Sequence, residues 1–169
     1  MTAPPRVVVR RLVPDDWETQ RDLRLSALAD SPSAFITTLD QARQAPEQQW
    51  RDRIATSPHF VADVDGTPAG MAVGLRIDNG SAEVVGVWVH PDARGSGAIE
   101  GLLDAASAWA ADEGHDRLAL WVVDGNERAE RAYARYGFTR TGRSQPVPGR
   151  DGETEVEMVR RLRSLGRRP

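Results

Sequence analysis

The spacing of apolar residues changes from helical to extended near residue 58, and strands then alternate with helices after residue 91. Seven segments have the short, β-branched or alternating character of strands, namely residues 7–12, 60–64, 69–77, 83–89, 118–123, 138–143 and 154–162. Four segments have helical spacing, namely residues 15–29, 47–55, 99–110 and 127–136. The order β-α-α-β-β-β-α-β-α-β-β predicts a mixed sheet with helices on both faces.

Local signals refine this outline. Asp15 is expected to cap the first helix, as the first residue of a capping box. The strand at residues 83–89 is apolar almost throughout, so we expect it to lie centrally in the sheet. Gly86 interrupts that strand and indicates a bulge or a close approach by another backbone. Tight turns are expected at residues 65–66 and 78–80.

Length and composition exclude several classes of protein. A length of 169 residues predicts one domain, with its core at about residues 7–162 and a disordered tail at residues 163–169. The chain has no cysteine and only three widely separated histidines, so we expect no disulfide, no cysteine nucleophile and no metal site. The net charge of −3 gives no reason to expect a nucleic-acid partner. No apolar run approaches the roughly 18–20 residues that a membrane span requires, and the N-terminus lacks a signal-peptide core. We therefore expect no membrane partner and a cytoplasmic location.

The segment from Val87 to Gly97 carries the clearest chemical signal. A strand ends here, a turn containing glycines follows, and helical spacing begins directly after it. The first N–H groups of a helix lack partners within the helix, and the helix dipole adds about half a positive charge at this end. Glycines let a phosphate approach the backbone, and Arg94 supplies a charged, planar fork of donors. The segment therefore predicts a phosphate site.

A plain connection between a strand and a helix, with Arg94 in solvent, explains this segment equally well when it is taken alone. Two other phosphate motifs are excluded. No Gly-Lys-Ser/Thr occurs, so the segment is not a Walker loop, and the dinucleotide pattern G-x-G-x-x-G fails at Glu100.

Two stretches resemble motifs of one enzyme family. Residues 89–97 and the helix start after them resemble the acetyl-CoA motif Q/R-x-x-G-x-G/A of the GNAT family of N-acetyltransferases. Residues 126–138 resemble the second motif of that family, N-x-x-A-x-x-x-Y-x-x-x-G-F. The order of elements is also similar to the family fold over about residues 7–162. One departure occurs at Ile99, where a β-branched side chain replaces the Gly or Ala of the first motif.

The resemblance implies an α/β (α+β) fold with a central mixed, mostly antiparallel sheet of about seven strands flanked by four helices. It implies that a primary amine attacks the thioester of the co-substrate acetyl-CoA directly. The amine belongs to a small molecule, a peptide or a protein, and no metal takes part. The implied acetyl-CoA contacts are Val87, Val89, Arg94, Gly95, Ser96, Gly97, Ala98, Ile99 and Asn126. Val87 and Val89 would act through backbone groups, and an ordinary helix N-cap is the alternative for Asn126.

Two catalytic candidates follow from the resemblance. An alkyl amine with a pKa near 10.4 is neutral in only about one molecule in 10³ at pH 7, so the site needs a proton acceptor. Tyr133 matches the family's helix tyrosine, the acid for the departing thiolate, although its spacing alone favours a core aromatic. Glu83 lies eleven residues before Arg94, where some family members place a catalytic glutamate. A strand-edge charge that faces solvent is the alternative for Glu83, with water or another residue as the base.

The acceptor is expected to lie against the first two helices and the loop at residues 145–152. Trp17, Phe35 and Trp50 are candidate wall residues, although a core position explains each of them as well or better. Residues 30–35 resemble a segment of a bacterial subset of the family, which does not identify the acceptor. A GNAT-fold module that binds acyl-CoA with little or no turnover is the alternative function, and Ile99 favours it. Dimers are common in the family, so a homodimer is the assembly that the resemblance suggests.

Overall fold

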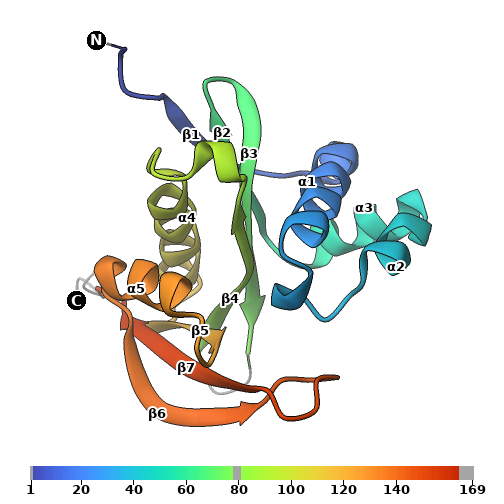
Figure 1. The fold of residues 1–169 in the computed structure, drawn as a ribbon. Coiled ribbons are helices and arrows are strands. Elements are labelled where there is room, and N and C mark those ends of the chain that lie inside the picture. Colours follow the sequence, from blue (N-terminus) through green and yellow to red (C-terminus); the bar gives the residue numbers. More distant parts are fainter. Residues whose placement is uncertain (1, 78–80, 164–169) are drawn as a thin grey trace. The chain divides into compact units, whose positions relative to one another are not determined.

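The structure is a computed structural model that describes residues 2–77 and 81–163 (Figure 1). These residues form seven strands: β1 (Val7–Arg11), β2 (His59–Val64), β3 (Thr67–Arg76), β4 (Ala82–Val89), β5 (Arg117–Val123), β6 (Thr139–Pro146) and β7 (Thr154–Arg161). The same residues form five α-helices: α1 (Trp17–Asp30), α2 (Leu39–Gln44), α3 (Glu47–Thr56), α4 (Ala98–Asp112) and α5 (Glu127–Tyr136). The turn predicted at residues 78–80 and residues 164–169 of the predicted tail lie outside the described residues.

The strands pair in the order β1-β2-β3-β4-β5-β7-β6. β4 and β5 run parallel, whereas β1 with β2, β2 with β3, β5 with β7, and β6 with β7 run antiparallel. This confirms the predicted mixed, mostly antiparallel sheet of about seven strands.

The chain divides into two compact units. Unit 1 comprises Met1–Gly74 and Gly86–Ala106, and unit 2 comprises Leu75–Val85 and Ser107–Pro169. β3, β4 and α4 each contribute residues to both units. The expectation of one domain over residues 1–169 stays a prediction.

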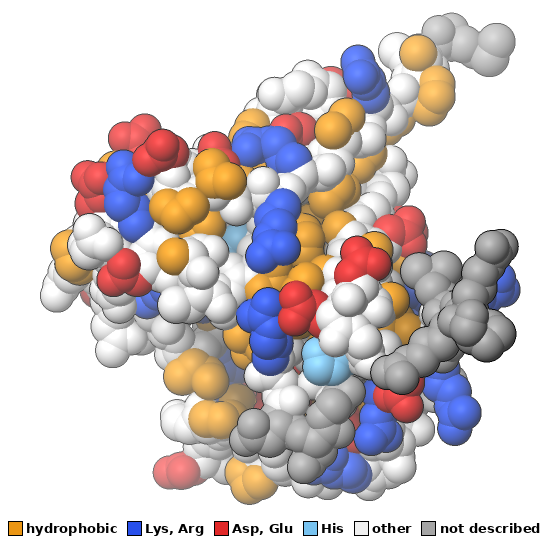
Figure 2. Space-filling view, turned by 180° about the vertical axis from the view of Figure 1, so that it is seen from behind, with side chains coloured by type: hydrophobic (Ala, Val, Ile, Leu, Met, Phe, Trp, Pro, Cys, Tyr) orange, Lys and Arg blue, Asp and Glu red, His pale blue; other side chains and the backbone are white. Residues whose placement is uncertain are grey.

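In unit 1, α1–α3 lie against one face of β1–β3 and the first half of α4 lies against the other (Figure 1). α1 buries Leu23, Ala27 and Leu28, which follow helical spacing and join the core around Trp50. Gly101 lets α4 approach β1 closely, because a Cβ there would lie 2.9 Å from the Val9 side chain. The exposed face of α1–α3 mixes acidic and basic side chains (Figure 2), so it presents no field of a single sign.

The helices differ from the prediction in two details. α1 begins at Trp17. The carboxylate of Asp16, rather than that of Asp15, accepts a hydrogen bond from the Val13 N–H, at 2.9 Å. The predicted capping role of Asp15 is therefore wrong. All four predicted helices are present, and α2 is an addition that begins with a capping box of Thr38 and Gln41.

Unit 2 is built on β5, whose buried residues pack with those of β7. Leu118, Leu120, Val122 and Met158 are nearly inaccessible to solvent, so this pair of strands forms the centre of the unit. The register of β6 against β7 shifts between Arg140 and Ser144. This irregularity ends the simple alternation of side chains along β6.

Candidate active site

β4 leads through a short 3-10 turn at Pro91–Ala93 into α4, as the sequence predicts. Gly95 and Gly97 have φ values of +78° and +94°, a region that other residues rarely adopt. A Cβ built on either glycine would meet nothing within 4 Å. The turn is therefore open at both positions, and a side chain there would occupy the space in front of α4.

Several N–H groups of this turn have no acceptor among the residues that the structure describes. The N–H of Ser96 bonds to the carbonyl three residues earlier, and the N–H of Ala98 bonds to the Ser96 hydroxyl, each at 3.3 Å. Within the described ranges, the N–H groups of Gly95, Gly97 and Ile99 donate to no protein group. Together with the helix dipole, N–H groups of this kind are suited to an anion. Ala98 is buried and its N–H is already bonded, so its N–H is the least suited of these to hold an anion.

Arg94 is tied to α1 rather than extended into the opening. Its Nε donates to the Val89 carbonyl at 3.2 Å, and its Nη2 pairs with Asp30 Oδ2 at 3.0 Å. Asp30 also accepts from Trp88 Nε1 at 3.0 Å and from Ser31 Oγ at 2.8 Å. These bonds, that of Trp88 first, lower the pKa of Asp30. Arg94 therefore fixes the corner between β4 and α4, and its Nη1 donates no hydrogen bond to the described residues.

β4 holds Val87 and Val89, the two predicted backbone contacts. Val87 is half-buried and Val89 is almost buried. Gly86, directly before Val87, has a φ of +60°, and a bulge at this position stays a prediction. The group that approaches it is a side chain rather than a backbone, since a Cβ on Gly86 would lie 3.3 Å from Nη1 of Arg24.

The second predicted motif forms the helix α5 of unit 2. Asn126 Oδ1 accepts from the Ala129 N–H at 3.3 Å, so Asn126 caps this helix and keeps its side-chain NH₂ exposed. Tyr133 packs edge-on against Phe138, with ring centroids 6.0 Å apart. Burial raises the pKa of Tyr133 to about 12. The hydroxyl therefore keeps its proton at neutral pH.

Glu83 belongs to a network of polar side chains within unit 2. Its Oε1 accepts from Trp121 Nε1 at 3.1 Å, and Trp121 lies opposite Glu157 in the β5–β7 register. Glu157 is 7% exposed, accepts from Thr141 Oγ1 at 2.9 Å and pairs with Arg143 at 3.0 Å. Burial raises the pKa of Glu83, the bond from Trp121 lowers it, and the charge of Glu157 raises it again. A carboxylate with a raised pKa is suited to accepting a proton.

Trp121, Arg143 and Glu157 are not among the residues predicted from the sequence. The available signal is Glu157 itself, a charged residue between Val156 and Met158, which are both buried. A carboxylate in such a run needs partners on neighbouring strands. A sequence read segment by segment does not show which residues those partners are.

The two predicted motifs lie within one stretch that matches a known family. Residues 22–138 match the model of the acetyltransferase (GNAT) family. The chain belongs to the GNAT family. An uncharacterised N-acetyltransferase of Mycobacterium tuberculosis (strain H37Rv) is 35% identical over 112 residues, which cover 66% of this chain and 69% of that protein.

Two further relatives extend the comparison. The mycothiol acetyltransferase of Thermobispora bispora is 31% identical over 131 residues, which cover 74% of this chain but only 43% of that enzyme. This GNAT chain therefore spans less than half the length of that relative. The solved structure of the acetyltransferase yncA from Salmonella typhimurium, with its cofactor acetyl-CoA, has a TM-score of 0.72 at 19% identity. That match covers 97% of this chain and 98% of that one, and it shows a shared fold.

The three residues predicted to line the acceptor site of this GNAT protein differ in their exposure to solvent. Trp50 is completely buried, so it lies in the core, the alternative that the sequence left open. Phe35 is 9% exposed and joins the same core, with the Arg24 guanidinium 4.5 Å from the centre of its ring. Trp17 is half-buried at the edge of this core. Trp17 thus keeps more surface for a ligand than Phe35 or Trp50.

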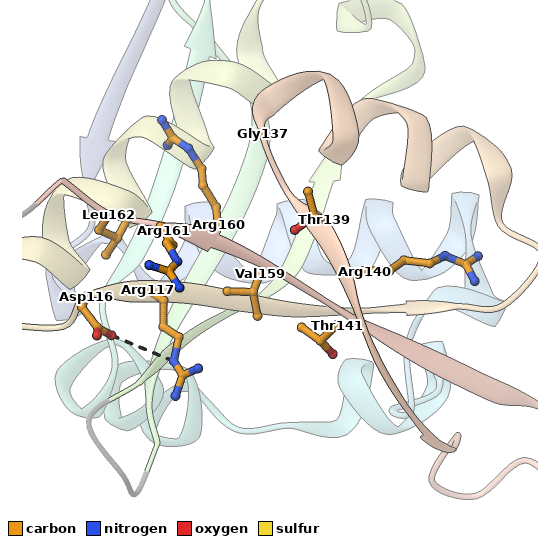
Figure 3. A pocket seen from close by; sticks show the side chains of 10 residues that line it. All are labelled: Asp116, Arg117, Gly137, Thr139, Arg140, Thr141, Val159, Arg160, Arg161 and Leu162. Atoms are coloured by element: carbon orange, nitrogen blue, oxygen red, sulfur yellow. Dashed lines mark ion pairs between the residues drawn. The ribbon is translucent and has the colours of Figure 1, made fainter.

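A hollow of about 790 Å³ lies in unit 2, against β5, β6 and β7 (Figure 3). Basic side chains line it, including Arg117, Arg140 and Arg160. Arg140 is paired with Glu130, and Arg160 donates to the Ser107 hydroxyl at 3.2 Å. Neither catalytic candidate lines this hollow, so it is separate from the predicted chemistry.

The described residues contain no group of three or more His, Asp or Glu side chains that could hold a metal ion. Two of the histidines serve the local fold: His59 Nδ1 lies 2.8 Å from the Ser57 carbonyl, and His90 Nδ1 accepts from the Asp92 N–H at 3.2 Å. No helix in residues 2–77 and 81–163 combines the length and apolar character needed to cross a lipid bilayer.

Proposed function

We propose that this GNAT protein transfers the acetyl group of acetyl-CoA to a primary amine of a small molecule or a protein. The open turn at Gly95 and Gly97 carries this proposal, because its N–H groups without protein acceptors suit the diphosphate of that co-substrate. Ser96, Ile99 and the remaining donors of Arg94 would complete the diphosphate contacts. Membership of the family, and the acetyl-CoA in the Salmonella structure, support the same co-substrate.

The proposed reaction has no covalent enzyme intermediate. Glu83 takes one proton from the ammonium form of the acceptor, which costs about 4–5 kcal/mol to neutralise in water at pH 7. The amine nitrogen then bonds to the thioester carbon as the C–S bond breaks, and the second nitrogen proton ends on the departing sulfur. The Val87 N–H would stabilise the negative charge on the thioester oxygen.

Tyr133 would stabilise the departing thiolate. Its pKa of about 12 lies above the value of about 8.5 for an ordinary thiol. Complete transfer of the tyrosine proton would therefore cost roughly 5 kcal/mol at about 1.36 kcal/mol per pKa unit. We therefore propose that the hydroxyl donates a hydrogen bond to the sulfur and retains its proton.

Release of free CoA from acetyl-CoA tests this proposal. The chain has no cysteine, so a thiol reagent detects only the CoA that the reaction sets free. The panel should contain polyamines, amino acids, aminoglycosides and peptide N-termini. We expect release that requires both protein and amine. A panel without any amine-dependent release would contradict acetyl transfer.

A GNAT-fold module that binds acyl-CoA with little turnover is the second candidate. The half-buried Ile99, at the start of α4, is the observation that favours it. Thermal unfolding with and without CoA separates the two functions when it is combined with the release assay. A ligand at about 100 times its Kd adds about 2.7 kcal/mol to the free energy of unfolding. Stabilisation by CoA without release would support the binding module.

A further inference from the structure

Arg24 is a half-buried arginine of α1 without an acidic partner among the described residues. Its guanidinium stacks over Phe35 and lies close to Gly86 of β4, where an added Cβ would be 3.3 Å from Nη1. Burial, followed by the charge of Arg53, lowers the pKa of Arg24 to about 10. The side chain therefore remains a cation at neutral pH.

Other arginines of unit 1 have carboxylates beside them. Arg51 pairs with Asp15 at 2.6 Å, and Arg21, three residues before Arg24 on the same helix, pairs with Asp22 at 2.9 Å. A charge withdrawn from water without a counter-ion destabilises a protein. The missing counter-ion of Arg24 therefore needs an explanation.

The groups around Arg24 are basic as well. Arg53 lies over the Trp50 ring at 4.9 Å. Burial lowers the pKa of the nearby His59, and the charges of Arg53 and Arg24 lower it further. We call Arg24, Arg53 and His59 the basic cluster. No carboxylate of the described residues forms an ion pair with it.

A second polar group of the same helix lacks a partner. Gln20 lies one turn before Arg24, is 4% exposed, and its Oε1 accepts no hydrogen bond from the described residues. Residues four apart share one face of a helix. This face of α1 therefore carries a cation without a counter-ion and an acceptor oxygen without a donor among the described residues.

We propose that Arg24 and Arg53 bind an anionic group, a carboxylate or a phosphate, on the amine acceptor. This inference rests on the proposed acetyl transfer. Arg24 reaches β4 at Gly86, directly before Val87, whose N–H is assigned to the thioester oxygen. An anion held there lies beside the strand that positions the reacting carbonyl. The acceptor is therefore a small molecule that carries an amine at one end and an anion at the other.

Paired acceptors that differ only in charge test this assignment. The probes are 4-aminobutanoate and 5-aminopentanoate, the amides of both, and O-phosphoethanolamine. Charge-assisted hydrogen bonds contribute about 1.5–3 kcal/mol, so we expect kcat/KM to be roughly 10- to 100-fold higher for an acid than for its amide. A higher value for O-phosphoethanolamine than for both acids would assign the anion to a phosphate.

Arg24→Met is the test variant, because a methionine keeps apolar contact with Phe35, and Arg24→Gln is a second one. Arg21→Met is the matched control, since Arg21 also stacks on an aromatic ring, that of Trp17 at 5.0 Å. We expect either change at Arg24 to reduce the acid-to-amide ratio to about one while turnover of the amide persists. Arg21→Met should leave the ratio unchanged. A ratio of about one in the parent protein, or a preference that survives both Arg24 variants, overturns the proposal.

Calorimetric binding of the acetylated products separates this inference from acetyl transfer. The probes are 5-acetamidopentanoate and its amide, which need no turnover. Binding of the acid by the parent but not by Arg24→Met, without CoA release from any amine, would refute acetyl transfer and support the anion site. Equal binding of the acid and the amide would refute the anion site.

Discussion

The turn before α4 and the network around Glu83 present polar groups in different ways. The turn of unit 1 offers backbone N–H groups, and two glycines with positive φ keep the space before them open. The network of unit 2 consists of side chains from four strands: Trp121 bonds to Glu83, Thr141 and Arg143 contact Glu157, and the Arg143 guanidinium lies over the Trp121 ring. The turn depends on glycines, which have no side chain to fill the opening, whereas the network around Glu83 depends on which side chains are present.

This difference teaches which substitutions should affect binding and which should affect chemistry. A change in the turn should alter affinity for acetyl-CoA, because the proposed diphosphate contacts lie there. A change at Glu83 or Tyr133 should alter turnover and its pH dependence, because protons and hydrogen bonds act there. Four substitutions test this division, from the largest expected effect to the smallest.

Replacing Tyr133 with phenylalanine should have the largest effect. We expect kcat to fall by about 10²-fold, at the low end of the range for loss of one hydrogen-bond donor to a developing charge. The Kd of acetyl-CoA should change little, since only the hydroxyl is removed. Steady-state kinetics and calorimetry measure the two quantities. Unaltered kcat would remove Tyr133 from the mechanism.

Glu83→Gln should lower kcat about 10-fold and remove one limb of the pH profile. The pKa of Glu83 is raised, so the carboxyl takes up its proton at a higher pH than an ordinary glutamate. As pH falls through that pKa the base is lost, and the parent rate should fall with it. The pH profile of kcat for parent and variant measures this. If the acidic limb persists in Glu83→Gln, another group is the base.

Gly97→Ala should weaken acetyl-CoA binding by about 10-fold, because the new Cβ enters the opening at a φ of +94°. Gly114→Ala is the matched control, with a φ of +89° and equally open space around its Cβ. Both variants should lose a similar stability of about 1–2 kcal/mol. Calorimetry and denaturant unfolding measure the two effects. Equal affinity for acetyl-CoA in both variants would exclude the turn as the diphosphate site.

Ile99→Gly should have the smallest effect on binding. The substitution removes a β-branched side chain from the start of α4 and leaves the backbone N–H in place. We expect acetyl-CoA affinity to stay the same or to improve, as measured by isothermal titration. A marked weakening would show that the Ile99 side chain supports the turn.

Local sequence patterns predict the turn before α4 well. A strand, glycines and a helix start lie next to each other in the chain, so Gly86, Gly95 and Gly97 could be identified from their neighbours alone. The positive φ values at all three positions agree with that interpretation. The strands were predicted for the same reason, since the alternation and turns that specify each one are local.

Features that depend on partners far along the chain were not predicted. Trp121 meets Glu83 across β4 and β5, 38 residues apart, and Arg143 meets Glu157 through the register shift of β6. Strand register is set by the whole sheet, so no single segment reveals these pairs. α2 was missed for another reason: it has six residues and buries only Ala42, which is too little for helical periodicity to show.

Asp30 has a consequence for protein engineering. Its carboxylate accepts hydrogen bonds from Trp88 on β4 and from Arg94 in the turn after β4. Positions 30, 88 and 94 therefore depend on one another, although they lie far apart in the sequence. A chimera that takes α1 from a homologue should carry positions 30, 88 and 94 together. Recombination between them would leave an arginine or an indole without its hydrogen-bond acceptor and would weaken the corner between β4 and α4.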